Sequence, residues 1–247
     1  MSLRGAKRRG NLLLDFLYIL QEIAASGGLA PLLAMTPIFE SVQNTKRQFD
    51  CLKGKTMNLI LASASPRRKE LLSLFGVPFI IRAADIDEAM DPNKAPFDEV
   101  ARVSRLKALA TEHEDGDVVI AADTIVVCGG EVLGKPRDEE DARRMLRLLS
   151  GRDHQVMTGV TVIAGGEAVT FTEVTDLHFR ELSEKEVCRY VATGEPMDKA
   201  GSYGIQGGAA LFCTGMNGDY YNVMGLPVCA LGEVLKKTAP QLMGEFV

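Results

Sequence analysis

Serine and arginine residues that suit anion binding follow a short apolar run near residue 60. The motif SASPRRK begins at Ser63, and it contains Ser65, a good N-cap residue, and Pro66, which suits the first position of a helix. Three cations then occupy the first helical turn, where positive charge opposes the helix dipole unless an anion is bound there. We therefore expect Ser63, Ser65, Arg67 and Arg68 to surround a phosphate, and a solvated basic helix start is the alternative.

A carboxylate that could take part in catalysis follows a second apolar run. Asp123 comes directly after the apolar residues 118–122 and directly before Thr124. We expect the strand 117–122 to end here, and α/β proteins bind ligands at the carboxyl ends of their strands. Asp123 could coordinate a divalent metal or accept a proton from water. An aspartate that only caps a hairpin turn is the structural alternative.

Two further motifs have the spacing of known catalytic loops but lack required residues. Residues 129–135 match the phosphate-binding pattern GxxxxGK up to Lys135, but Pro136 stands where that motif needs Ser or Thr, and the glycines fit a hairpin turn. We exclude a P-loop and keep Lys135 as a phosphate contact. Ser202 lies in a sequence similar to a nucleophile elbow, but Ala200 replaces its first glycine and no histidine follows, which excludes a Ser-acid-His hydrolase.

The last chemically suggestive segment is the loop 198–207, with the sequence DKAGSYGIQG. Gln206 is its best candidate for recognising a base edge, because an amide both donates and accepts hydrogen bonds. A plain structural turn is the alternative. The three histidines form no pair with metal-ligand spacing, and we expect them to be structural: His113, His154 and His178.

The elements that must position these loops alternate between strands and helices from Met57 onward. Two glycine turns, at Gly129-Gly130 and Gly165-Gly166, each predict a hairpin. The pattern predicts a mixed α/β sheet. The expected strands are 58–62, 78–82, 117–122, 124–128, 131–133, 154–164, 168–180 and 209–213. The expected helices are 66–75, 97–113, 138–150, 183–193 and 228–237, the fourth with a capping box formed by Ser183 and Glu186.

Composition and charge restrict the class of protein. The 247 residues are 46% hydrophobic and 25% charged, as in ordinary globular domains. Five widely spaced cysteines without a CxxC pair suggest neither a disulfide framework nor a zinc site, so we expect a reducing, cytoplasmic location. The net charge of −5 argues against nucleic-acid binding. Residues 57–247 alone, with 20 basic and 29 acidic side chains, carry −9. An acidic chain that binds an anion must gather positive charge locally.

The first 56 residues differ from the rest in charge and pattern. They carry eight basic and four acidic side chains, and their apolar stretch at 12–20 contains Asp15 and is too short to span a bilayer. No sustained helix or strand period follows it. We predict a poorly packed extension over 1–56, with Met57 as the start of the functional domain 57–247. A genuine targeting arm is the alternative.

Four motifs in order along 57–247 resemble those of the Maf family of nucleoside triphosphate pyrophosphatases. They are SASPRR at 63–68, AADT at 121–124, GKPRD at 134–138 and DKAGSYGIQG at 198–207. The resemblance implies a mixed α/β fold with an elongated central sheet that two lobes share, and a nucleotide cleft between the lobes. Family members often form homodimers.

The same resemblance implies roles for individual residues. The proton acceptor of the family falls on Asp123, and its specificity positions fall on Arg67, Thr124 and Gln206, in the pattern of the branch that acts on dTTP and UTP. Charged residues used by the family match Glu88, Lys107 and Lys135 less firmly, and Glu88 with Asp123 forms the implied metal site. Water would attack the α-phosphorus and release pyrophosphate, with Mg²⁺ or Mn²⁺ as cofactor. Clearance of non-standard nucleotides is the purpose expected of the family.

Two alternatives stay open at this point. One is a nucleotide-binding regulator of cell division or septum formation, which senses a nucleotide without hydrolysing it. The other is the same chemistry with a preference for a modified nucleotide, such as 7-methyl-GTP. The sequence indicates a nucleoside triphosphate as the partner, with neither nucleic acid nor membrane.

Overall fold

The computed structural model describes residues 57–243, and the extension predicted over 1–56 lies outside the described residues. Three strands form the parallel part of the sheet: β1 (Leu59–Leu61) pairs with β2 (Phe79–Ile81) on one side and with β3 (Val118–Cys128) on the other. Parallel neighbours need a crossover connection, which α3 (Pro66–Ser73) and α4 (Pro96–Ala110) supply.

The remaining strands extend the sheet in antiparallel fashion. The short strand β4 (Glu131–Leu133) folds back on the end of β3 through a glycine turn. The long strands β5 (Asp153–Ala164) and β6 (Glu167–Phe179) follow, and β7 (Cys213–Asn217) completes the order β2-β1-β3-β5-β6-β7. The predicted mixed α/β architecture is confirmed.

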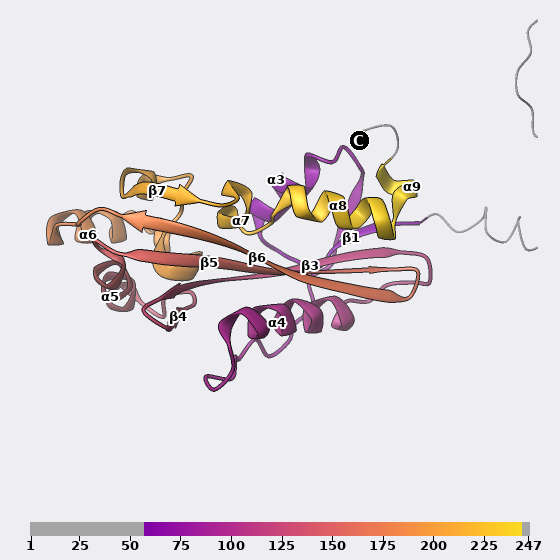
Figure 1. Ribbon diagram of the computed structural model, residues 1–247, viewed down its shortest axis with the longest axis horizontal. Coiled ribbons are helices and arrows are strands. Elements are labelled where there is room, and N and C mark those ends of the chain that lie inside the picture. The colour runs from indigo at the N-terminus through magenta and orange to yellow at the C-terminus, as the bar shows by residue number, and fades with distance from the viewer. Residues whose placement is uncertain (1–56, 244–247) are drawn as a thin grey trace, which may run out of the picture. The chain divides into compact units, whose positions relative to one another are not determined.

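Helices cover the sheet on both faces (Figure 1). The helices α7 (Tyr220–Met224), α8 (Val228–Thr238) and α9 (Pro240–Met243) lie with α3 on one face, and α4 lies on the other. The helices α5 (Glu139–Leu149) and α6 (Glu184–Val191) lie at the end of the long strands that is farther from α8 and α9. Short 3-10 turns at Glu195–Asp198, Ala200–Ser202 and Gly208–Leu211 connect α6 to β7.

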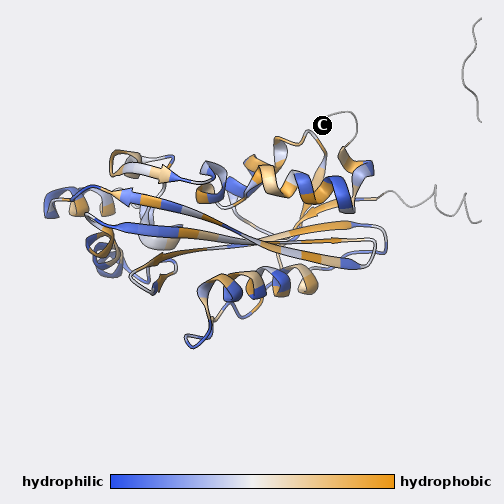
Figure 2. Ribbon diagram, in the orientation of Figure 1, coloured by the Kyte–Doolittle hydropathy of each residue, from blue (hydrophilic) through white to orange (hydrophobic). Residues whose placement is uncertain are grey.

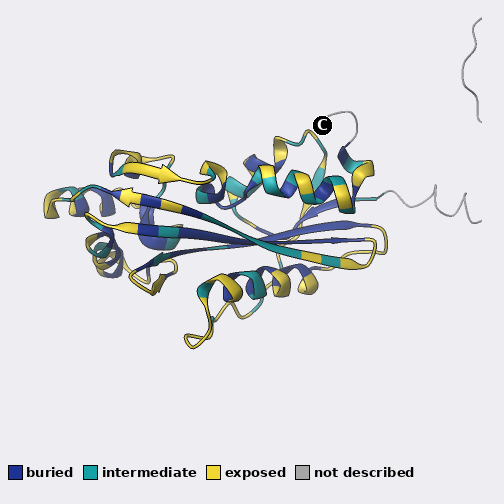
Figure 3. Cartoon of the chain, viewed as in Figure 1, coloured by how far each residue is buried: buried dark blue, intermediate teal, exposed yellow. Residues whose placement is uncertain are grey.

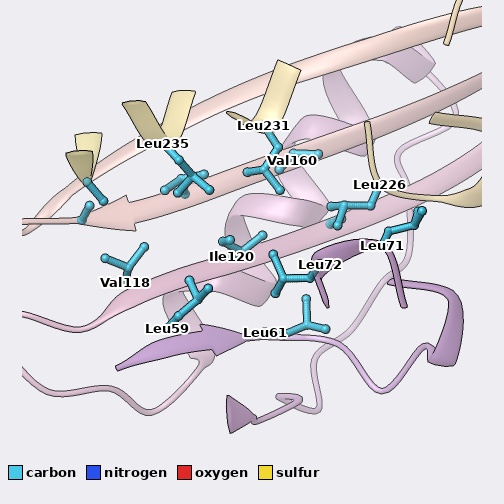
Figure 4. Packing of buried hydrophobic residues seen from close by; sticks show 14 of the residues in the cluster. Leu59, Leu61, Leu71, Leu72, Val118, Ile120, Val160, Leu226, Leu231 and Leu235 are labelled. Carbon is cyan, nitrogen blue, oxygen red and sulfur yellow. The ribbon is translucent and has the colours of Figure 1, made fainter. Parts of the chain in front are cut away.

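The hydrophobic core follows this division into two ends of one sheet. One cluster packs α3 and α8 on β1, β3 and β5, with Ile120, Leu226 and Leu231 fully buried (Figure 4). A second cluster packs α5 and α6 on the other half of β3 and β5 and on the end of β6, around Leu146 and Phe179. The strands β3 and β5 are buried along most of their length (Figure 3), and α8 carries apolar residues beside polar ones (Figure 2). Between the two clusters, the shared strands run past the segment at Asp123.

The predicted end of a strand at Asp123 is wrong. β3 continues without interruption from Val118 to Cys128, and β5 pairs with it from Val119 to Val127, with Asp123 opposite Gly159. The strand β5 pairs with the residues of β3 both before and after Asp123, so the backbone has no reason to leave the sheet at this residue. The much shorter β1 ends at Leu61, so the Asp123 side chain lies beyond the end of its neighbour.

The strand predicted at 209–213 is also wrong. Residues Gly208–Leu211 form a 3-10 turn, and β7 begins only at Cys213. Ala209 and Phe212 are buried while the intervening Leu211 is 76% exposed. A spacing of three between buried residues fits a 3-10 turn, whereas a strand would bury every second residue.

Candidate active site

One cleft of about 820 Å³ opens where β1 ends beside the middle of β3. Its walls come from the start of α3, from β3, from the segment that precedes α4, and from the loop after α6. All ten residues singled out from the sequence line it: Ser63, Ser65, Arg67, Arg68, Glu88, Lys107, Asp123, Thr124, Lys135 and Gln206.

A lysine lies between two carboxylates in the lining of the cleft. The Lys107 ammonium lies 2.7 Å from an Asp123 carboxylate oxygen and 2.9 Å from a Glu88 carboxylate oxygen. Lys107 comes from α4 and Asp123 from β3, and both are buried, while Glu88 is exposed. The ammonium group thus fixes the orientation of the Asp123 carboxylate at the wall of a solvent-connected cleft.

Arg68 joins three separate segments of the cleft lining. Its guanidinium donates to the Gly225 carbonyl oxygen at 2.8 Å, to the Thr124 hydroxyl at 2.9 Å and to the Ser63 hydroxyl at 3.2 Å. Burial lowers the pKa of Arg68, and the nearby charge of Asp123 opposes that shift. A guanidinium keeps its proton at neutral pH in any case, so Arg68 supplies fixed positive charge.

The Thr124 hydroxyl continues into a buried polar chain. It lies 3.0 Å from the Thr158 hydroxyl on β5, and Thr158 donates to the Asn222 carbonyl oxygen at 3.1 Å. The Asn222 amide in turn donates to the Val156 carbonyl oxygen and to the Thr175 hydroxyl. Because Arg68 and Thr158 both contact Thr124, its hydroxyl is held in one position at the cleft wall.

Arg67 lines the cleft and pairs with an exposed carboxylate. Its guanidinium is 3.3 Å from an Asp198 carboxylate oxygen, and Lys199 contacts the other oxygen of that carboxylate at 2.6 Å. Burial opposes ionisation of Asp198, but Lys199 and Arg67 outweigh it and hold the pKa of Asp198 below its ordinary value. Since Asp198 is exposed, an incoming anion can compete with it for Arg67.

Three polar residues of the cleft keep their side chains free of partners within residues 57–243, namely Ser65, Lys135 and Gln206. Neither the Lys135 ammonium nor the Gln206 amide makes a hydrogen bond or ion pair there, and both residues are exposed. The Ser63 side chain, in contrast, has partners. The Ser63 hydroxyl accepts from the Ser65 backbone N–H at 3.3 Å, while Ser65 occupies the N-cap position of α3 without a side-chain cap bond.

Positive charge is concentrated in this cleft. Five basic side chains line it against three acidic ones, in a chain that is acidic from residue 57 onward. The acidic lining residues are Glu88, Asp123 and Asp198, and the basic ones are Arg67, Arg68, Lys107, Lys135 and Lys199. Together with the free N–H groups at the start of α3, this excess suits a polyanionic ligand.

The carboxylates also fit a divalent cation that is held jointly with a ligand. Mg²⁺ is usually bound by one or two carboxylates together with substrate phosphates, rather than by a cage of protein ligands. Glu88 and Asp123 already share one cation, the Lys107 ammonium, so their oxygens converge. Among residues 57–243, no cluster of three or more His, Cys, Asp or Glu side chains has metal-binding geometry.

None of the three histidines is part of the cleft lining. His154 is buried against Phe179 and contacts the Tyr203 hydroxyl at 3.0 Å, and burial lowers its pKa to about 4. His113 contacts the Thr111 carbonyl oxygen, and His178 contacts Asp153.

Sequence reasoning did not select the residues that hold the loop around Gln206. Tyr190 and Glu195 bond to each other and to backbone groups of the segment 204–208. Neither carries a local signal, because Tyr190 follows the ordinary apolar pattern of α6 and Glu195 lies in a polar turn. Thr158 was likewise missed, since its partner Thr124 lies 34 positions away.

Comparison with known proteins gives consistent matches over the described part of the chain. The model of the family described as "Maf-like protein" matches residues 58–238. A dTTP/UTP pyrophosphatase of Bacillus cereus (strain AH820) is 49% identical over 180 residues, which are 72% of this chain and 94% of that protein. A dTTP/UTP pyrophosphatase of Bacillus cereus (strain ATCC 10987 / NRS 248) is 48% identical over 187 residues, 75% of this chain and 92% of that protein.

A solved structure gives a more distant match. A HAM1 protein from Coxiella burnetii aligns with a TM-score of 0.39 and 16% identity, over 74% of this chain and all of that one.

Proposed function

This chain belongs to the Maf-like family, and we propose from its cleft that it hydrolyses nucleoside triphosphates, with dTTP and UTP as substrates, to a nucleoside monophosphate and pyrophosphate. The observation that carries this proposal is the buried pair of Asp123 and Lys107 at the wall of a cleft rich in basic side chains. A binding module that only recognises a polyanion has no need for a buried carboxylate beside its ligand.

The roles of the side chains follow from their positions. Arg67, Lys135 and the N–H groups at the start of α3 bind and orient the triphosphate, because phosphoryl transfer depends on positioning and charge neutralisation. Asp123, held by the Lys107 ammonium, orients a water molecule toward the α-phosphorus and accepts its proton. The P–O bond to the β-phosphate breaks, and pyrophosphate leaves.

Glu88 and Asp123 are the residues that would hold a divalent cation together with the triphosphate. Such a cation, when bound, supplies additional neutralisation of phosphate charge. We propose Mg²⁺ or Mn²⁺ for this site.

Base recognition is assigned to two side chains that line the cleft, Thr124 and Gln206. The Thr124 hydroxyl is fixed by Arg68 and Thr158, and the Gln206 amide is exposed and without a partner in the described residues. An amide offers a donor and an acceptor to a pyrimidine edge. A preference for a modified base such as 7-methyl-GTP is the alternative within the same chemistry.

The test is pyrophosphate release from dTTP, UTP, CTP, GTP and 7-methyl-GTP, with and without Mg²⁺ or Mn²⁺, by the wild type and by Asp123→Asn. We expect release from dTTP and UTP, and a loss of about 10²- to 10⁴-fold in Asp123→Asn. Nucleotide binding should persist in the variant, because it leaves the basic side chains in place.

Two results of that assay would redirect the proposal. Tight nucleotide binding without release from any nucleotide would favour the regulator of cell division or septum formation. Equal turnover by Asp123→Asn would remove Asp123 from catalysis.

We also propose a cytoplasmic location. The cysteines of the described residues are all free: Cys128, Cys188, Cys213 and Cys229. Free thiols persist in reducing compartments. No helix within residues 57–243 has the length and apolar character needed to cross a membrane.

A further inference from the structure

We propose that Tyr190 and Glu195 are positioning residues that hold the loop 204–208 in one conformation, so that Gln206 distinguishes one pyrimidine base from another. The inference rests on the proposed function, because it assumes that the cleft binds a nucleotide. It assigns a role to two side chains outside the residues that contact the substrate.

Hydrogen bonds from these two side chains reach both ends of the loop. The Tyr190 hydroxyl donates to a Glu195 carboxylate oxygen at 2.9 Å and accepts from the Gly204 backbone N–H at 3.0 Å. The other Glu195 oxygen accepts from the Gly208 backbone N–H at 3.1 Å. Gln206 lies midway between the two anchored glycines.

The loop also packs directly on the carboxylate. A Cβ atom built at Gly207 would lie 2.0 Å from a Glu195 oxygen, and one at Gly204 would lie 2.8 Å from the Lys199 side chain. The Lys199 ammonium in turn donates to the Glu195 carbonyl oxygen. Only a chain without side chains at these positions can approach Glu195 so closely.

The anchor itself is rigid. Tyr190 is buried on α6, where its ring packs against Phe212 with centroids 5.2 Å apart. Burial and the bond to Glu195 raise the pKa of Tyr190, so its hydroxyl keeps the proton that it donates. The exposed Gln206 amide therefore projects from a fixed loop, which reduces the entropy that it loses on binding a base.

The experiment measures binding of the non-hydrolysable α,β-methylene analogues of UTP and CTP by calorimetry. Uracil and cytosine differ in donors and acceptors on the edge that an amide can contact. The Kd of the CTP analogue divided by the Kd of the UTP analogue therefore reports base discrimination. We expect Tyr190→Phe to lower this ratio about fivefold, since it removes two hydrogen bonds and keeps the buried ring. Tyr220→Phe, which removes an exposed hydroxyl outside the cleft, is the matched control and should leave the ratio unchanged.

Double variants that combine Tyr190→Phe with Gln206→Ala distinguish this positioning role from a general effect on the structure. In a Gln206→Ala background, Tyr190→Phe should change this ratio of Kd values less than twofold, because the side chain that the loop positions is gone. Glu195→Ala should behave like Tyr190→Phe. Glu195→Gln should retain most of the discrimination, since its amide can donate to the Tyr190 hydroxyl and accept from the Gly208 N–H.

The inference would be overturned if Tyr190→Phe weakened the binding of both analogues equally. It would also be overturned if Tyr190→Phe changed the ratio of Kd values by the same factor with and without the Gln206 side chain. A wild-type protein that binds both analogues equally would overturn it as well. The readout is binding, so an inactive wild type would count against the proposed hydrolysis and leave this comparison intact.

Discussion

Arg68 illustrates how single side chains of this site serve both stability and chemistry. Its three hydrogen bonds join the start of α3, β3 and the turn before α8, segments that are up to 157 positions apart. A lysine has the same charge but not the planar set of five donors. One ammonium group cannot reach all three acceptors.

Arg68→Lys should therefore lower the free energy of unfolding by about 1–3 kcal/mol, because two acceptors lose their donors in a partly buried site. Urea denaturation measures the change. Arg105→Lys is the matched control, since Arg105 makes one exposed hydrogen bond, of 3.3 Å, to the Ala168 carbonyl oxygen. Similar losses in both variants would contradict a special role for the Arg68 contacts.

Lys135 differs from Arg68, because its side chain has no partner within the described residues and is free to contact a ligand. Lys135→Ala should therefore leave the stability within about 0.5 kcal/mol of the wild type. The KM for the triphosphate should rise about tenfold, the effect of one lost charge-assisted hydrogen bond. Lys185→Ala removes an exposed cation that does not line the cleft, and it should leave KM unchanged. An unchanged KM in Lys135→Ala would exclude a phosphate contact.

The site residues differ in how far the sequence alone could identify them. Ser65, Pro66, Arg67 and Arg68 carry a local signal, because helix-start residues and clustered cations indicate an anion site without knowledge of the fold. The convergence of Lys107, Glu88 and Asp123 has no such signal. Lys107 and Glu88 were selected only from the resemblance to the Maf family, since α4 brings Lys107 to β3 through tertiary packing.

At the scale of elements, α4 positions Lys107 through an unusually close approach to β5. A Cβ atom at Gly159 would lie 2.4 Å from the Val100 carbonyl oxygen on α4. That contact is with backbone, which cannot swing away as a flexible side chain can. Gly159 therefore sets the distance between helix and sheet beside Asp123, its partner in the strand pairing.

Gly159→Ala should push α4 away from the sheet and lower the free energy of unfolding by about 1–3 kcal/mol. Turnover should fall as well, because Lys107 moves away from Asp123. Gly215→Ala is the control, since its new Cβ would meet only His178 at an ordinary 3.7 Å. Thermal unfolding and pyrophosphate release measure the two effects. A Gly159→Ala variant that matches the Gly215→Ala variant in both would contradict this role of α4.

Elements whose ends are marked by characteristic residues close together in the sequence were predicted correctly. Ser183 and Glu186 form the expected capping box at the start of α6, and both glycine-turn hairpins are present. The strand expected at 209–213 failed because a short apolar run does not distinguish a strand from a 3-10 turn. The continuity of β3 through Asp123 depends on β5, whose contribution the local sequence does not contain.

At the scale of the whole molecule, a buried histidine ties stability to pH. Burial holds the pKa of His154 at about 4 in the folded protein, below its ordinary value of 6.5. Between these values the unfolded chain binds a proton that the folded protein does not, so stability falls as the pH is lowered through this range. The full effect is about 3 kcal/mol.

Urea denaturation between pH 7 and pH 5 measures this dependence. His154→Gln removes the titrating group and should flatten the decline, although it lowers the stability at pH 7 by disturbing the packing on Phe179. His113→Gln changes a histidine outside the buried cluster and should leave the slope as in the wild type. An identical slope in His154→Gln would show that other groups cause the decline.

The shared sheet gives the molecule its cleft, because β3 and β5 pass through both hydrophobic clusters and carry Asp123, Thr124 and Thr158 at their junction. The chemistry proposed there is attack by water on the α-phosphorus. Hydrolysis of UTP in ¹⁸O-labelled water, followed by mass spectrometry of the products, tests it most directly. We predict one labelled oxygen in UMP and none in pyrophosphate. Label in pyrophosphate, or UDP and phosphate as the products, would contradict the account.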